Sequence, residues 1–97
     1  MQLEYKEAAI ERVVGEVEDL ATRIAELKRR FARQRVSVKL EYYWELEHVR
    51  TRFAEFKRRV QDLEFADERE LETLQEAVEV AWKDLVQAVD TLLAALP

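Results

Sequence analysis

The segment Glu45-Leu46-Glu47-His48 holds the residue types in this sequence that are most typical of a chemical site. A glutamate and a histidine three positions apart on one helix can both reach a metal ion, as in di-iron carboxylate bundles. The hydrophobic pattern places Leu46 and Val49 on the packed side of such a helix, which leaves Glu45 at the flank and turns His48 outward. We therefore expect His48 to be a surface residue, expect no metal site, and rank a di-metal carboxylate bundle last among the functions considered.

The chain lacks the residues that most other catalytic sites need. It has no cysteine, one histidine and one glycine among its 97 residues. The usual pairs of nucleophile and base, and the glycine-rich loops that cradle phosphates, therefore cannot be assembled. Its acidic side chains are spread among lysines and arginines, as on ordinary solvent-exposed helix faces. We expect a protein without enzymatic activity that uses no cofactor and no small-molecule substrate.

A run of cations followed by aromatic residues is the second candidate site. Between residues 28 and 39 the sequence has six basic side chains and no acidic one. Cations beside aromatic rings can hold a nucleic-acid backbone and stack on its bases, or can lie at an anionic membrane surface. The candidate binding residues of this stretch, which spans residues 28–44, are Lys28, Arg29, Arg30, Arg33, Arg35, Lys39, Tyr43 and Trp44.

The same stretch also has a purely structural interpretation. The cations can lie near the negative C-terminal end of the last helix, and the spare apolar side of that helix can cover Tyr43 and Trp44. We favour this interpretation, because the net charge of −5 works against a nucleic-acid partner. Binding of a nucleic acid or of a membrane surface through residues 28–44 stays an alternative function.

Long helices must position all of these side chains. From Glu16 to Leu96 the chain contains no glycine and no proline, and apolar residues recur at alternating steps of three and four. This pattern predicts α-helices packed by coiled-coil seams. With 97 residues and 38% charged residues, the chain has the length of a single domain, residues 1–97, and has no stretch apolar enough for a membrane span.

Two seams precede residue 64 and differ in phase. The first runs through residues 3–31 and the second through residues 42–63. They are displaced by one residue, which is about 100° of helix rotation. Either a turn near Ser37 or a skip within one continuous helix explains this shift. Because Ser37 is the only turn former of the connecting stretch and lies between two valines, we expect one helix over about residues 4–64.

The last helix begins where the second seam stops. Asp67, with Glu70 three positions later, is typical of a helix N-cap, and we expect a returning helix over about residues 68–96. Its C-terminal half is apolar on two sides and needs more than one neighbour. The expected all-α fold is thus a coiled-coil helical hairpin that assembles into a helical bundle. The alternative is a monomeric three-helix bundle with a turn near Ser37.

The hairpin predicts self-assembly. A core of this size is small, so oligomerisation is an ordinary way to stabilise it, and we expect a homo-oligomer, either a dimer or a tetramer. A helical seam also accepts a partner helix, so the expected function is structural or protein-interaction. The residues of the expected assembly seam are Leu46, Val49, Phe53, Phe56, Leu71, Leu74, Trp82, Leu85 and Val89.

The cellular compartment is inferred from what the sequence does not contain. Without cysteine there is no disulfide framework, so nothing indicates an oxidising compartment. The N-terminal residues also lack the charged-then-apolar layout of a signal peptide. We expect a cytoplasmic protein.

Several short motifs between Val38 and Leu85 fall in register with one known family. They are Leu40-Glu41-Tyr42, Leu46-Glu47 with Arg50, Ala66-Asp67, and Ala81-Trp82-Lys83-Asp84-Leu85. In these residues the chain resembles small bacterial coiled-coil proteins described as stress-response proteins, which have a long charged helix and a Trp-rich returning helix. That family usually has a serine at the turn and a first tryptophan in the returning helix, where this chain has Asp67 and Leu71. The resemblance implies an uninterrupted helix through Ser37 and a role in stress tolerance without an assigned chemistry.

Overall fold

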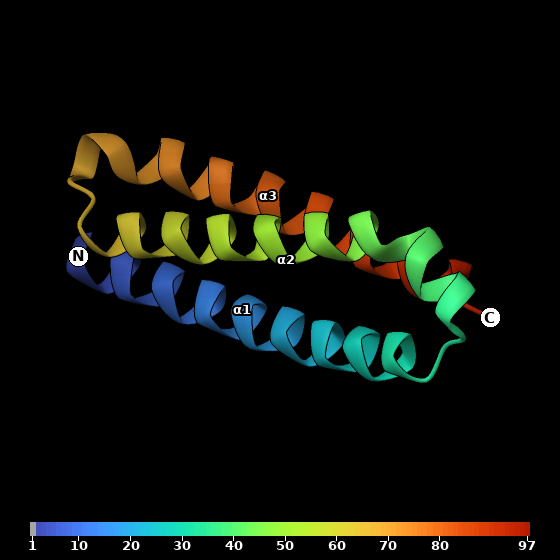
Figure 1. Cartoon of the computed structure of the whole chain (residues 1–97). Coiled ribbons are helices and arrows are strands. Elements are labelled where there is room, and N and C mark those ends of the chain that lie inside the picture. Colours follow the sequence, from blue (N-terminus) through green and yellow to red (C-terminus); the bar gives the residue numbers. More distant parts are fainter. Residues whose placement is uncertain (1) are drawn as a thin grey trace.

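Three long helices run up, down and up along one bundle. In the computed structural model, which describes the backbone of residues 2–97 and the side chains of residues 5–97, they are α1 (Gln2–Ala32), α2 (Val36–Glu64) and α3 (Glu68–Ala95). The bundle measures 54 × 18 × 16 Å along its principal axes. Figure 1 shows that α1 and α3 run in the same direction while α2 runs back between the two turns.

The expectation of one helix over residues 4–64 is wrong. The chain leaves the helical path after Ala32, and α2 starts at Val36, so the fold is the three-helix bundle stated above as the alternative. The turn lies at Arg33–Arg35, just before Ser37, which is already in the first turn of α2. The implied uninterrupted helix through this region is wrong for the same reason. The turn resolves the phase shift, because each seam can now face one shared core.

A glutamine forms this turn in place of a glycine or proline. The backbone N–H of Gln34 donates to the carbonyl of Phe31 at 3.1 Å, and its side-chain Nε2 donates to the carbonyl of Arg30 at 3.1 Å. Both carbonyls belong to the last turn of α1, where helix acceptors have no partner within the helix. Arg35 then adopts an extended conformation, with φ −64° and ψ 156°, and α2 begins.

The second turn is confirmed as the sequence predicts it. α2 ends at Glu64, and the side chain of Asp67 accepts hydrogen bonds from the backbone N–H groups of Arg69 and Glu70, both at 3.0 Å. These bonds satisfy donors at the start of α3, which have no acceptor within the helix. Lys6 of α1 reaches across and donates from Nζ to the carbonyl of Ala66 at 2.8 Å.

The core is a continuous apolar cluster in which all three helices take part. α1 contributes the predicted seam residues Val13, Leu20, Ile24 and Leu27, all buried. Within this single chain, the residues of the expected assembly seam also lie in or against the core. Those that are buried are Leu46, Val49, Phe56, Leu71, Leu85 and Val89, and those that are half-buried are Phe53, Leu74 and Trp82.

Polar side chains join α1 and α3 along their solvent-exposed edge. The pairs are Tyr5 with Gln75 at 2.9 Å, Arg23 with Asp90 at 2.9 Å, and Arg12 with Glu79. Exposed ion pairs contribute little to stability, typically below about 1 kcal/mol each, so burial of the seams is the main source of the fold's stability. Among the helices of the described chain, none is both long enough and apolar enough to cross a membrane.

Candidate interaction surface on helix α2

Four apolar side chains of α2 point into solvent. Val36, Leu40, Tyr43 and Trp44 are 71%, 72%, 47% and 72% exposed, respectively. Their spacing of four, three and one places them on one side of the first turns of the helix. We call these four residues the apolar stripe. Single exposed apolar residues are ordinary, whereas a contiguous group on one helix face is typical of an interaction site.

The apolar stripe lies on the side of α2 that faces away from the core. Tyr42 and Leu46 are on the opposite side, where Leu46 is buried and Tyr42 packs against the core. The rings of Tyr43 and Trp44 contact each other edge to face, with centroids 5.2 Å apart and an interplanar angle of 79°. The first turns of α2 are therefore apolar on two faces, of which the fold uses only one.

The prediction that α3 covers Tyr43 and Trp44 is wrong. The second apolar side of α3 is used within the bundle, because α3 packs against both α1 and α2. Val89 is buried, and Trp82 and Leu93 pack partly buried against the core. α3 therefore does not reach the outer side of α2, and Tyr43 and Trp44 stay exposed.

The predicted cations surround one end of the bundle but do not act as one cluster. Arg29 forms an ion pair with Glu26 at 2.6 Å and lowers the pKa of that carboxyl through a hydrogen bond and its charge. Arg30 donates from Nη2 to the carbonyl of Leu96 at 3.4 Å, so its predicted position at the C-terminal end of the last helix is confirmed. The other four predicted cations form no ion pair with any described side chain; they are Lys28, Arg33, Arg35 and Lys39.

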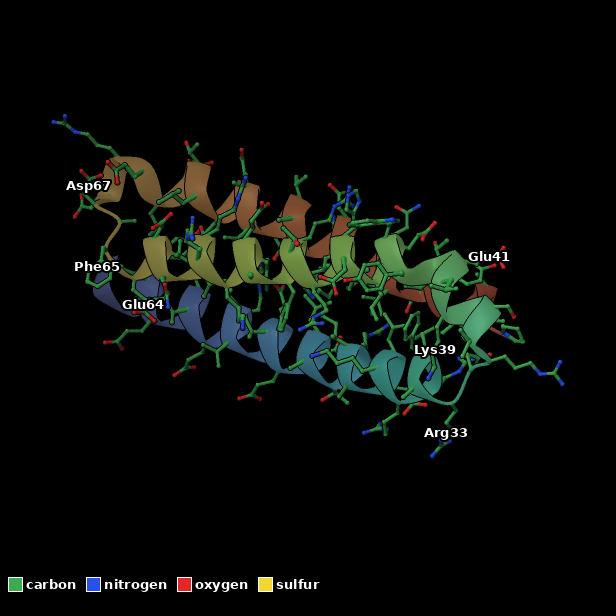
Figure 2. All side chains as sticks on the ribbon, in the orientation of Figure 1. Arg33, Lys39, Glu41, Glu64, Phe65 and Asp67 are labelled. Carbon is green, nitrogen blue, oxygen red and sulfur yellow. The ribbon has the colours of Figure 1, made fainter. Side chains whose placement is uncertain are left out.

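The opposite end of α2 is acidic, with Asp62 and Glu64 in its last turn. Figure 2 shows Arg33 and Lys39 at one end of the bundle and Glu64, Phe65 and Asp67 at the other. Phe65, directly after α2, is 85% exposed. The signal that could have found this residue is its spacing from Trp44, because Phe65 follows Trp44 by three heptads and lies at the C-cap of α2.

The glutamate and histidine of the metal motif are both exposed. Glu45 and His48 lie beside an open groove between α2 and α3, together with Arg52 and Asp84. His48 is thus confirmed as a surface residue. Within residues 5–97 there is no group of three or more histidine, cysteine, aspartate or glutamate side chains placed to hold a metal ion.

Glu16, which does not belong to the apolar stripe, has a strongly raised pKa. Burial between α1 and α3, followed by a hydrogen bond to Glu79 and the charge of Glu79, raises the pKa of Glu16 to about 7. Arg12, whose Nε lies 3.8 Å from the carboxylate of Glu16, acts in the opposite direction. This pair lies on the side of the bundle formed by α1 and α3, so we treat it as part of the fold.

Comparison of the chain with protein-family models, with curated proteins and with solved structures finds no match.

Proposed function

We propose that this protein is a non-enzymatic interaction module that binds a helical protein surface along the outer side of α2. The observation that carries the proposal is the apolar stripe, whose four side chains lie on one helix face and have no intramolecular partner that buries them. Burying such a stripe removes apolar area from water at about 25 cal/mol per Å². Within one bundle the apolar stripe stays in water, so this free energy is available for binding a partner.

The spacing of the apolar stripe fits recognition of a helix. Val36, Leu40 and Tyr43 follow the i, i+4 and i+7 pattern with which amphipathic helices present side chains to a partner. Trp44 adds a large aromatic ring, and aromatic residues are common energetic centres of protein interfaces. The helix that carries these residues is held by the core, so little conformational freedom is lost when a partner binds.

A photo-crosslinking amino acid at Tyr43 tests this function inside cells. We expect crosslinks to one defined protein species from Tyr43, and none from the exposed position Glu18 on α1. The crosslink should disappear in Leu40→Gln/Trp44→Gln, a variant that keeps the helical circular dichroism of the wild type because both side chains are exposed. Equal crosslinking from both positions, or a crosslink that survives the double substitution, would contradict the proposal.

Binding of an anionic surface is the second candidate function. It is favoured by cations without ion pairs, such as Arg33 and Lys39 at one end of the bundle (Figure 2), and by the exposed ring of Trp44 in the N-terminal part of α2. Binding of a single-stranded oligonucleotide, or of vesicles that contain phosphatidylserine, would be seen as a change in tryptophan fluorescence at low salt. It should vanish in Arg33→Glu/Lys39→Glu and weaken as salt is added.

The cellular setting of this function is a proposal as well. The resemblance to stress-response coiled-coil proteins supports a role in stress tolerance in the cytoplasm. Removal of the gene would then lower survival under stress, and the Leu40→Gln/Trp44→Gln variant would fail to restore it.

A further inference from the structure

We propose that the partner of the apolar stripe is a second copy of this chain, bound antiparallel along α2 so that two three-helix bundles form a closed, two-fold symmetric dimer. This inference rests on the proposed function and names its partner. Three independent features of α2 support it: the apolar residues at its two ends, the charges at its two ends, and the residues between them.

The apolar residues of the outer face lie at both ends of α2. Trp44, Thr51 and Arg58 follow one another at intervals of seven within α2, so they share the side of the helix opposite the core seam. Phe65, seven residues after Arg58, is the C-cap residue that directly follows the helix. Reversing a second copy about a point near Thr51 brings Phe65 of each chain opposite the start of α2 in the other. Phe65 is 85% exposed and Val36 is 71% exposed, so each would gain an apolar neighbour.

The charges at the two ends are complementary in this same orientation. Arg33, Arg35 and Lys39 mark one end of α2, with no acidic residue between them. At the other end lie Asp62, Glu64, Asp67 and Glu68, with no basic residue between them. An antiparallel partner places the basic end of each copy against the acidic end of the other, twice in one dimer, whereas a parallel partner would bring like charges together.

These charges are unfavourable for α2 itself. The N-terminal end of a helix favours acidic side chains and its C-terminal end favours basic ones. α2 has no acidic residue in its first turn and no basic residue in its last turn, and Arg35 occupies the N-cap position without a side-chain hydrogen bond. The charge pattern therefore opposes the stability of the isolated helix, and an antiparallel partner supplies the missing compensation at both ends.

The residues in the middle of the outer face allow two helices to approach. Thr51 and Ala54 are exposed and short, and the carboxylate of Glu47 is already paired with Arg50 of its own chain at 3.2 Å. Arg58 follows Thr51 by seven residues and Trp44 precedes it by seven, so the two are equally far from the centre of the face. An antiparallel partner thus brings the guanidinium of Arg58 level with each exposed indole, where a cation–π contact is attractive.

The symmetry of this contact makes the assembly finite. Each copy uses the same surface, so two copies satisfy each other and no free binding face remains. Head-to-tail joining of basic and acidic ends would leave one end open and would continue into a filament. The two assemblies differ in shape, because a side-by-side dimer keeps about the 54 Å length of one bundle.

Light scattering combined with small-angle scattering is the first experiment. We expect a species of twice the 11.6 kDa chain mass whose length stays close to that of one bundle. Two double variants should weaken the dimer by about tenfold or more while the helical circular dichroism is unchanged: Arg33→Glu/Lys39→Glu and Asp62→Lys/Glu64→Lys. The matched control is Arg52→Glu/Lys83→Glu, which changes the net charge by the same amount as the first pair and should leave the dimer intact.

Mixing the two weakened variants tests whether the charged ends pair with each other. The first variant is acidic at both ends of α2 and the second is basic at both ends, so equimolar mixing should restore a heterodimer. Failure of the mixture to associate would overturn the antiparallel arrangement even if the wild type is dimeric. Longer particles in wild-type solutions would overturn the closed dimer in favour of a filament.

The absence of cysteine permits a direct check of the two-fold axis. Thr51→Cys should form an intermolecular disulfide on mild oxidation, because both copies of this position lie near the axis, whereas Ala21→Cys on the exposed side of α1 should not. A wild type that stays monomeric at all concentrations would overturn the self-association but not the proposed function, because crosslinking from Tyr43 would then identify a different protein. A dimer that persists in Leu40→Gln/Trp44→Gln would overturn the apolar stripe as the contact between copies, and the crosslink from Tyr43 would still decide the proposed function.

Discussion

The side-chain amide of Gln34 donates a hydrogen bond to the backbone carbonyl of Pro97 at 3.2 Å, in addition to its bond to the carbonyl of Arg30 at 3.1 Å. One side chain thus joins the turn between α1 and α2 to the end of α3. Together with the contact from Arg30 to the carbonyl of Leu96, this ties the first turn to a part of the chain more than sixty residues away.

The first prediction concerns this turn. Gln34→Ala removes both side-chain bonds and should lower the free energy of unfolding by about 1 kcal/mol, because two backbone carbonyls lose a donor. The midpoint of thermal unfolding should fall by about 4–8 °C for a domain of this size. Gln87→Ala, at an exposed position of α3, serves as control and should have little effect. Equal midpoints for the two variants would show that the turn does not depend on Gln34.

The second prediction follows from the raised pKa of Glu16. The carboxyl binds its proton with a pKa of about 7 in the folded chain against a usual value of 4.5, so the folded state holds the proton more tightly than the unfolded state. Its contribution to stability is therefore fully present below about pH 4.5 and is lost as the pH rises through 7. Glu16→Gln cannot lose this proton and should exceed the wild type at pH 8 by about 1 kcal/mol.

Urea unfolding at several pH values between 4 and 8 measures this difference. The gap between Glu16→Gln and the wild type should widen from pH 4.5 to pH 7 and then stay constant. Glu18→Gln, on the exposed side of α1, should run parallel to the wild type over the whole range. A gap that does not change with pH would mean that Glu16 titrates near its usual value.

The third prediction concerns the single glycine. Gly15 lies inside α1, has an ordinary helical backbone conformation, and has no neighbouring atom within 4 Å of the position that an added Cβ would occupy. Gly15→Ala should therefore stabilise the fold by about 1 kcal/mol, the difference in helix propensity. Ala21→Gly on the same helix should shift the midpoint of thermal unfolding in the opposite direction. A destabilised Gly15→Ala would show that the glycine has a role beyond the helix.

The fourth prediction separates the core from the outer face. Leu85 is 1% exposed and Leu40 is 72% exposed, although both are leucines within heptad-patterned helices. Leu85→Lys buries a charge in the core and should destabilise the fold by at least about 3 kcal/mol, enough to unfold a small domain. Leu40→Lys should leave the helical circular dichroism at room temperature unchanged, because the side chain is exposed within the bundle. Tolerance of Leu85→Lys would contradict the arrangement of the core.

Most of the helical architecture could be predicted from local pattern. The seam of α1, the end of α2 near residue 64 and the start of α3 at Asp67 depend on short-range rules of heptad spacing and capping, which act within a few residues. The exposure of His48 also followed, because its neighbours Leu46 and Val49 define the packed side of one helix.

The candidate surface could be predicted only in part. The sequence marked Tyr43 and Trp44 as aromatic residues beside cations, but their exposure depends on whether α3 reaches the outer side of α2, which is a question of how three helices share one core. Val36, Leu40 and Phe65 were missed as surface residues because an apolar residue in a helix is normally assigned to the packed side. The structure shows instead that these three residues lie on the side of α2 that no other helix covers, and that the side with Leu46 and Phe56 is the buried one.

By itself the sequence determined that the chain is all-helical, which residues form the seams, and where the last helix begins, because these properties are set by contacts between residues near in sequence. Only the tertiary structure decided that α1 stops at Ala32 and that α2 presents a second apolar face to solvent. The turn at Arg33–Arg35 has no glycine or proline to impose it. It is stabilised instead by contacts with the distant end of α3, and by the burial that both seams gain when they face the same core.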